Sequence, residues 1–234
     1  MPFDNQDTSF KMKLAAQPFG YTQTAPAPQT TPALSYDRGF KRLFDITAVL
    51  LSAVFVVPLI AIMALLVARD GHAPFYTQKR IGRNGRMFRI IKMRTMVHNA
   101  DELLEEHLKT DPELRAEWDS TQKLKNDIRI TPIGRILRKT SMDELPQLIN
   151  VLTGSMSLVG PRPMMPSQEV LYPGRSYYNL RPGITGFWQI SDRNDCDFCD
   201  RAKYDAAYER ALSFRTDLSV LWRTVAVVLR GTGY

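Results

Sequence analysis

Residues 139–163, KTSMDELPQLINVLTGSMSLVGPRP, contain residue types and spacings that could carry out chemistry on a phosphate. Two adjacent carboxylates, Asp143 and Glu144, stand just before an apolar, helix-like run. A helix N-terminus stabilises negative charge and turns backbone N–H groups toward phosphoryl oxygens, so it would keep an Asp ionised. An ionised Asp is a competent nucleophile toward phosphorus, and its neighbour can hold magnesium. The pattern is therefore compatible with phosphoryl transfer.

The same two carboxylates also have a purely structural explanation. Ser141 followed by Glu144 three residues later fits a capping box, in which both side chains satisfy the first N–H groups of a helix. Pro146 is accepted only in a first helical turn and favours a helix start nearer Asp143. From these residues alone, capping and catalysis both stay open.

Cations flank the carboxylates on both sides in the sequence. Arg138 precedes them, and Arg162 stands between Pro161 and Pro163, where it loses little freedom on binding a diphosphate. An ordinary surface turn would explain Arg162 equally well. The whole chain of 234 residues has a formal net charge of +7. This charge favours phosphorylated ligands, nucleic acid or an anionic membrane surface, and composition does not choose among them.

Residues 46–68, ITAVLLSAVFVVPLIAIMALLVA, contain no charged side chain. As a helix they would reach ~35 Å, which is enough for a hydrocarbon core of roughly 30 Å. Pro58 would kink this helix, and basic residues lie on both flanks, although positive residues tend to stay on the cytoplasmic side. An ordinary kinked span and a helix that enters, breaks at Pro58 and returns to the same face are both compatible with the sequence.

Residues 75–96, FYTQKRIGRNGRMFRIIKMRTM, predict a β-hairpin. Two short β-capable runs flank Asn84 and Gly85, a dipeptide that accepts the positive φ of a hairpin turn. The second strand carries Arg89, Lys92 and Arg94 among apolar residues, as a phosphate-binding strand or a solvated face beside lipid headgroups would.

The remaining segments carry no chemistry of their own. The Pro-, Thr- and Gln-rich residues 1–36 predict a disordered tail, and residues 99–127 predict helices interrupted by Pro112. The last 22 residues predict an amphipathic helix that would lie in the membrane interface or pack into the core. Cys196 and Cys199 supply only two of the four usual zinc ligands, so we expect free thiols.

Several motifs occur in order between residues 38 and 234: KRLFDI, QKRIGRNGRMFRIIKMRTM, ITPIGRILRKTSMDELPQLINVLTGSMSLVGPRP, RPGITGFWQISDRND and LWRTVAVVLRGTGY. Together they resemble the bacterial sugar transferases of the monotopic type, polyprenol-phosphate hexose 1-phosphate transferases that prime exopolysaccharide synthesis. The resemblance implies an α+β, membrane-associated fold. Residues 37–70 would form a re-entrant helix broken at Pro58, and residues 71–234 a mostly helical cytosolic catalytic domain with a small β-hairpin and interfacial amphipathic helices.

The resemblance also implies a reaction. Asp143 would attack the sugar-bearing phosphorus of a UDP-sugar and release UMP, and undecaprenyl phosphate would then attack the phosphosugar on the carboxylate. Asp143 and Glu144 would bind magnesium. The residues that the resemblance implies in substrate binding are Arg138, Arg162, Lys92, Arg94, Arg181 and Asp205.

The enzyme would act at the cytoplasmic face of the bacterial inner membrane, in contact with membrane lipid. The C-terminal end looks most like relatives that use UDP-galactose or UDP-glucose. A conventional glycosyltransferase, which would release UDP, has no support from a GxGxxG signature or long α/β alternation. A non-enzymatic membrane adaptor or a nucleic-acid binder would explain the charge but not the motifs, so we expect no nucleic-acid partner. The possibility of a homo-oligomer stays open.

Overall fold

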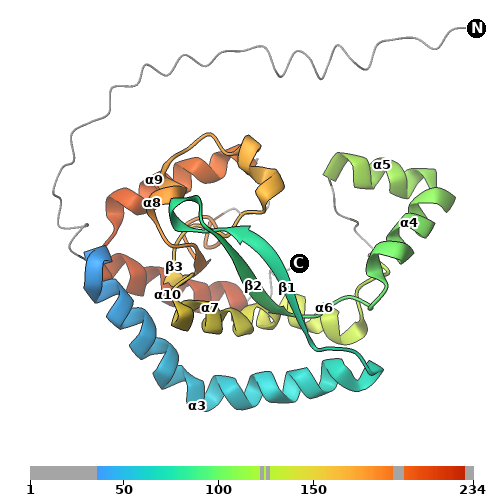
Figure 1. The fold of residues 1–234 in the computed structure, drawn as a ribbon, viewed down its shortest axis with the longest axis horizontal. Coiled ribbons are helices and arrows are strands. Elements are labelled where there is room, and N and C mark those ends of the chain that lie inside the picture. Colours follow the sequence, from blue (N-terminus) through green and yellow to red (C-terminus); the bar gives the residue numbers. More distant parts are fainter. Residues whose placement is uncertain (1–35, 122–123, 125–126, 192–197, 230–234) are drawn as a thin grey trace, which may run out of the picture. The chain divides into compact units, whose positions relative to one another are not determined.

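The computed structural model describes residues 36–121, 124, 127–191 and 198–229 (Figure 1). The predicted tail therefore lies outside the described residues except for Tyr36, which begins a short helical turn, Tyr36–Phe40, leading into the first long helix. Cys196 also lies outside them. Cys199 is an exposed free thiol.

Helices dominate the described chain, as predicted, and two small sheets complete it. The helices are α3 (Lys41–Val67), α4 (Ala100–Thr110), α5 (Pro112–Thr121), α6 (Pro132–Lys139), α7 (Leu148–Thr153), α8 (Ser176–Asn179), α9 (Arg201–Ala211) and α10 (Phe214–Leu229). One sheet pairs β1 (Phe75–Ile81) with β2 (Met87–Met93) as an antiparallel hairpin, and the other pairs β3 (Ser157–Val159) with β4 (Gly183–Thr185) in parallel.

Helix α3 is the apolar segment, and it bends part-way along its length (Figure 1). Pro58 lies inside it and explains the bend, because proline has no N–H for the helix ladder and its ring crowds the carbonyl four residues earlier. By length and composition the helix could cross a membrane, and only 11% of its most apolar stretch is buried. Its exposed apolar side chains include Leu50, Leu51, Val54, Phe55, Val57, Leu59 and Ile62.

Polar side chains fasten the beginning of α3 to the rest of the fold. The buried Lys41 ammonium forms an ion pair with Asp217 of α10 and donates to the Tyr208 hydroxyl of α9 at 3.0 Å. Arg42 donates to the carbonyl of Val151 and, at 2.7 Å, to that of the next residue, where α7 ends. Cations at a helix C-terminus are favourable because its carbonyls have no partners within the helix.

The far end of α3 packs against the hairpin and α6. Met63 and Val67 are buried against Met93 of β2 and Leu137 of α6. Both ends of the bent helix therefore contact the body that carries the hairpin, while its apolar middle stays exposed.

Two motifs noted in the sequence meet at the parallel sheet, where Ser157 pairs with Gly183. A Cβ on Gly160 would lie 2.2 Å from the Arg181 carbonyl oxygen, and one on Gly183 would lie 2.1 Å from the Gly160 nitrogen. No side chain fits at either position, so glycine is required where these two segments cross. The crossing fixes the loop that carries Arg162.

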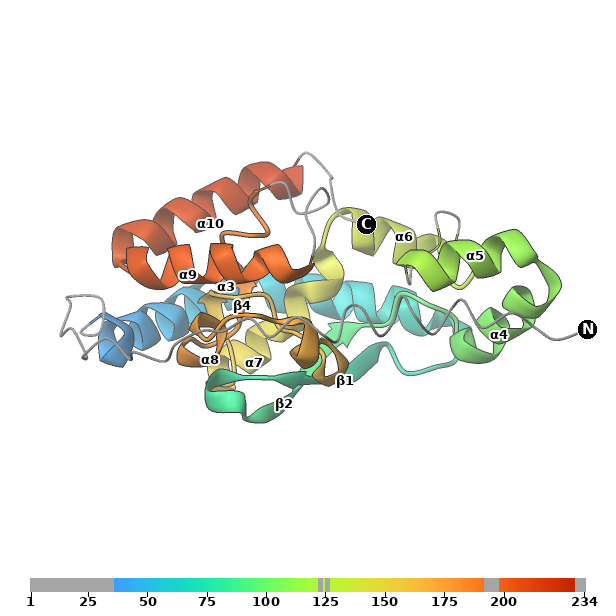
Figure 2. The ribbon, with the colours of Figure 1, turned by 90° about the horizontal axis from the view of Figure 1, so that it is seen from above.

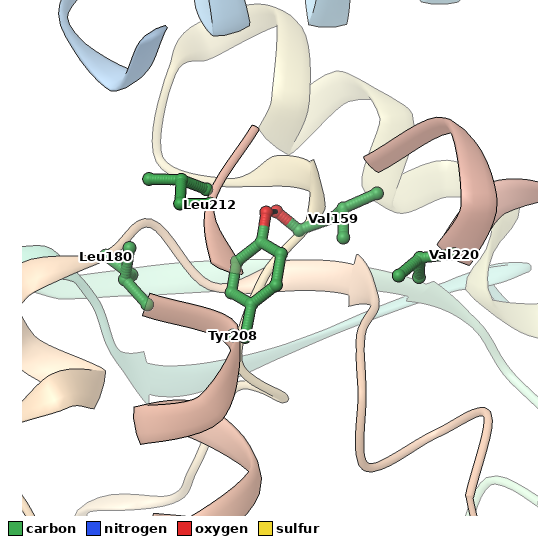
Figure 3. Packing of buried hydrophobic residues seen from close by; sticks show 5 residues of the cluster. All are labelled: Val159, Leu180, Tyr208, Leu212 and Val220. Carbon is green, nitrogen blue, oxygen red and sulfur yellow. Dashed lines mark hydrogen bonds between the residues drawn. The ribbon is translucent and has the colours of Figure 1, made fainter. Parts of the chain in front are cut away.

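The core beside β3 is built around Tyr208. Its ring packs among Val159, Leu180, Leu212 and Val220, and its hydroxyl points toward Val159 (Figure 3), 3.2 Å from that residue's carbonyl oxygen. The shorter hydrogen bond of this hydroxyl, at 2.6 Å, is donated to Asp217. In Figure 2, α9 and α10 lie together on one side of β4 and the β1–β2 hairpin lies on the other.

The hairpin has the predicted turn. Asn84 and Gly85 both have positive φ, at 57° and 73°. The last pair before the turn is Ile81 with Met87, so the connection runs through five residues, 82–86.

Helix α10 exposes three residues of its apolar stripe, Leu218, Trp222 and Val225, while Leu221 packs against the core. Trp222 is 78% exposed, and Leu218 and Val225 are exposed beside it, whereas Asp217 and Val220 face the core. The stripe is therefore available to a membrane interface, which is one of the two alternatives that the sequence left open.

Candidate active site

Asp143 and Glu144 lie in a 3₁₀ helix, Met142–Gln147, which leads into α7. The capping box is wrong: Ser141 adopts a left-handed conformation with φ 55° and its side chain makes no capping hydrogen bond. In a capping box the Glu144 carboxylate would accept from the Ser141 N–H, but that N–H donates to the Arg138 carbonyl at 3.0 Å. The Glu144 carboxylate turns to cations on other elements instead.

Glu144 is held by two cations that are distant in sequence. Its Oε1 accepts a hydrogen bond from Lys92 Nζ of β2 at 2.8 Å and one from Arg162 Nη2 at 3.3 Å. Burial alone would raise the pKa of Glu144, but Arg162 and Lys92 outweigh burial and lower this pKa to about 2. Glu144 is therefore ionised throughout the neutral range.

Asp143 has the opposite balance. Burial raises its pKa, and the negative charge of Glu144 adds to this, while Lys92, Arg138 and Arg162 lower it without reversing the shift. Lys92 Nζ lies 4.0 Å from Asp143 Oδ2. The expectation that a helix start would keep Asp143 readily ionised is thus corrected: burial opposes the ionised form of this carboxyl group.

Asn150 of α7 fixes the hairpin against the carboxylates. Its buried amide donates to the Arg89 carbonyl at 2.8 Å and its Oδ1 accepts from the Ile91 N–H at 3.0 Å. Asn150 thereby bonds the two backbone groups of β2 that flank Ile90, as a neighbouring strand would. Ile90 lies two residues before Lys92. The distance from Lys92 to Glu144 depends on this contact.

Arg138 approaches Asp143 from α6. Its Nε donates to the Thr95 hydroxyl at 2.9 Å, and burial lowers the pKa of this guanidinium while Asp143 raises it. The structure therefore brings Arg138, Arg162 and Lys92 around the two carboxylates. Arg162 also lies over the Trp188 ring, with 5.9 Å between the guanidinium carbon and the ring centroid.

Arg94 lies elsewhere. Both of its terminal nitrogens contact Asp70, at 2.6 and 2.7 Å, and it also donates to the Val67 carbonyl at 3.2 Å and to Ala73 at 2.8 Å. It fastens the end of α3 to the end of β2. A role in substrate binding stays a prediction for this residue.

Arg181 and Asp205 also make contacts of their own. Arg181 Nε donates to the Gly154 carbonyl at 3.2 Å. Asp205 is buried on α9 and accepts from the Tyr172 hydroxyl at 2.8 Å; burial raises its pKa to about 6. The predicted roles of these two residues in binding stay predictions.

The two carboxylates suit magnesium by their chemistry. Mg²⁺ prefers oxygen ligands and is commonly held by one or two carboxylates together with substrate phosphates and water. Asp143 and Glu144 are adjacent, and the hydrogen bonds from Lys92 and Arg162 to Glu144 both go to its Oε1. No group of three or more metal-ligating side chains occurs within the described ranges, so a metal here would need water or a bound ligand to complete its coordination.

Comparison with known proteins identifies the family. The model of the family described as bacterial sugar transferase matches residues 36–231. The chain belongs to this family. Among bacterial sugar transferases, it is 48% identical over 198 residues to the UDP-galactose-lipid carrier transferase of Erwinia amylovora, covering 84% of this chain and 42% of that protein.

Two further relatives of this sugar transferase differ in length. The undecaprenyl-phosphate galactose phosphotransferase of Salmonella typhimurium is 42% identical, and the match covers 100% of this chain and 48% of that protein. The exopolysaccharide production protein ExoY of Rhizobium meliloti is also 42% identical, and the match covers 88% of this chain and 93% of that protein. This chain therefore spans about half of the galactose phosphotransferase and most of ExoY.

Sequence reasoning missed several residues that build the site. Nothing in the local sequence predicts the contacts of Asn150 and Arg42. A polar residue in a helix is usually solvated, and the partners of these two side chains are backbone groups of distant segments. Arg80 of β1 was also missed, although it donates to the Pro163 carbonyl at 3.4 Å beside Arg162. Residues 77–80 of β1 are all polar, so the sequence shows no alternation that could have marked Arg80.

Proposed function

We propose that this bacterial sugar transferase moves a hexose 1-phosphate from UDP-galactose or UDP-glucose to undecaprenyl phosphate, releases UMP and so begins exopolysaccharide assembly. The observation that carries the proposal is the pair Asp143 and Glu144, one buried beside three cations and the other held ionised by two of them. The names of the relatives, which include a galactose phosphotransferase and an exopolysaccharide production protein, support the substrate class.

In the first step, an Asp143 carboxylate oxygen forms a bond to the sugar-bearing phosphorus. The bond between that phosphorus and the bridging oxygen breaks, and UMP departs with the oxygen and its electron pair. An acyl phosphate that carries the sugar remains on Asp143. Burial favours this attack because a poorly solvated carboxylate loses little hydration on approaching the phosphate.

The surrounding cations make the meeting of anions possible. A carboxylate and a diphosphate repel each other, and phosphoryl transfer depends mainly on positioning and on neutralising charge. Lys92 and Arg138 act on Asp143, and Arg162 contacts Glu144. Their charges would lower the barrier to approach and stabilise the negative charge that spreads over the phosphoryl oxygens.

In the second step, a phosphate oxygen of the lipid acceptor attacks the same phosphorus. The bond to Asp143 breaks, the carboxylate is regenerated and the sugar is left on a lipid diphosphate. Magnesium held by Asp143 and Glu144 would neutralise phosphate charge in the loaded enzyme.

The membrane arrangement follows from the two substrates. The donor is soluble and the acceptor is a lipid phosphate, so the site must lie level with the headgroups. We infer that α3 enters and leaves the same leaflet, because both of its ends contact the catalytic body and its exposed apolar residues lie between them. The basic flanks then remain on the cytoplasmic side, which is the side that positive residues prefer.

The nucleotide product tests the reaction. The full chain in lipid nanodiscs is incubated with undecaprenyl phosphate and a panel of labelled nucleotide sugars, and the nucleotide and lipid products are measured. UMP and a labelled lipid diphosphate are expected, whereas UDP would indicate a conventional glycosyltransferase and contradict the proposal. Chelation of divalent cations is expected to stop turnover, and added magnesium to restore it.

A single substitution tests the nucleophile. Asp143→Asn is expected to abolish UMP release, because the amide is a poor nucleophile toward phosphorus. Asp101→Asn, at an exposed position in the first turn of α4, is the matched control and should keep wild-type turnover. Normal UMP release by Asp143→Asn would refute the covalent mechanism.

A further inference from the structure

Arg80 is a guanidinium on β1 to which the proposed reaction assigns no role. The register pairs Arg80 with Phe88 and Tyr76 with Lys92. Because side chains alternate between the two faces of a sheet, Arg80 and Lys92 project from the same face of the hairpin. They are separated by four positions along the strand, roughly 13 Å at ~3.4 Å per residue. Arg80 thus lies at the other end of the face that carries Lys92.

The contacts of Arg80 are with neutral groups. One terminal nitrogen donates to the Pro163 carbonyl at 3.4 Å and the other donates to the Gln78 side-chain oxygen. Its Nε is buried and has no hydrogen-bond partner. A guanidinium that is partly removed from water normally pairs with an anion, and buried N–H groups without acceptors are uncommon in folded proteins.

A second guanidinium lies close to the first. Pro163, which accepts from Arg80, directly follows Arg162, and the neighbouring Met164 carbonyl accepts from the Ile81 N–H at 3.1 Å. Burial lowers the pKa of Arg80, and the positive charge of Arg162 lowers it further. Arg162 has Glu144 as a partner, whereas Arg80 contacts neutral oxygens. An anion between the two arginines would relieve this repulsion.

The direction of the reaction identifies the anion. In phosphoryl transfer the attacking and leaving oxygens lie roughly in line through phosphorus. Lys92 and Arg138 act on the attacking carboxylate of Asp143. Arg80 instead contacts the backbone of the loop that carries Arg162, at the Pro163 carbonyl. Resting on the function proposed above, we propose that Arg80 and Arg162 together bind the phosphate of the departing nucleoside monophosphate. Arg80 is then a binding residue for the donor, not for the lipid.

Binding of UMP and of uridine to the full chain in detergent micelles tests the assignment by isothermal titration calorimetry. Arg80→Gln is expected to weaken UMP binding about 10- to 100-fold, the range for losing a hydrogen bond to a charged group, and to leave uridine binding unchanged. Arg80→Lys should also weaken UMP binding, because it keeps the charge but loses the planar fork. In turnover, KM for the UDP-sugar should rise while KM for the lipid phosphate stays constant.

Arg89→Gln is the matched control, since Arg89 is exposed and pairs with Lys79 on the opposite face of the same hairpin. It should bind UMP as the wild type does. Unchanged UMP affinity in either Arg80 variant overturns the assignment, and so does an equal loss of UMP and uridine binding, which would indicate a general loosening of the hairpin. A wild-type chain that releases no UMP from any UDP-sugar would instead overturn the proposed function.

Discussion

Replacing Asn150 by Ala should disturb both stability and catalysis, because a single buried side chain connects α7 to the hairpin. The substitution removes the acceptor of the Ile91 N–H and the donor to the Arg89 carbonyl, two backbone groups that then have no protein partner. Lys92 follows Ile91 directly, so its reach to Glu144 depends on this anchor.

The magnitude follows from the burial of each group. A buried polar group left unsatisfied costs about 1–3 kcal/mol. Asn150 is buried but Arg89 is exposed, so water can reach one of the two orphaned groups and the summed cost should be about 2–4 kcal/mol. For a domain of this size 1 kcal/mol shifts Tm by roughly 2–4 °C, so we expect Tm to fall by roughly 4–16 °C.

Thermal unfolding and UMP release are measured on the same preparation in detergent micelles. Below its Tm the variant should also lose about tenfold or more in kcat, since a misplacement of 1 Å can cost about 100-fold. Thr153→Ala is the control: this residue is exposed and its hydroxyl bonds locally, to the Asn150 carbonyl and the Ser155 hydroxyl, so both readouts should stay near wild type. A variant at position 150 with unchanged Tm and kcat would refute the view that this contact positions Lys92.

Three further predictions concern other charged residues. Lys92→Met removes a cation that opposes the burial of Asp143, so the pKa of Asp143 rises further and the acid limb of the UMP-release profile moves to higher pH; an unmoved limb would contradict this. Lys41→Met leaves Asp217 buried without its cation and should cost about 3 kcal/mol, the lower end for a broken buried pair because two tyrosines still donate to it, measured by denaturant unfolding. Arg94→Ala should lower Tm while leaving KM for the UDP-sugar unchanged; a raised KM with wild-type stability would favour the predicted binding role instead.

Local patterns predicted the elements whose cause is local. The uncharged run around Pro58 forms a long apolar helix, as predicted, because that outcome depends only on the composition and length of this one segment. Asn84 and Gly85 gave the hairpin turn because few other residues accept positive φ there. The amphipathic stripe of α10 was visible as a 3.6-residue period, although periodicity could not tell a core-facing stripe from an exposed one.

Contacts between distant segments had no such signal. The Lys41 and Asp217 pair joins positions 176 residues apart, and each residue alone looks like an ordinary surface charge. The capping box failed for the same reason: Ser141 and Glu144 have the right spacing, but Lys92 and Arg162 provide a stronger electrostatic partner from other elements.

The sequence by itself determined which side chains are present for phosphate chemistry, the adjacent carboxylates and the basic motifs around them. Tertiary structure alone decided which of these cations serve the carboxylates. A two-residue loop at Asn84 and Gly85 would pair Arg80 with Arg89 and turn it away from the face of Lys92, whereas the observed pairing with Phe88 puts both cations on one face. A shift of one residue in register reverses every side chain of a strand. Each strand is bonded to a different distant segment, β1 through the Ile81 N–H to the Met164 carbonyl and β2 through Asn150, and neither contact can be read from the turn sequence.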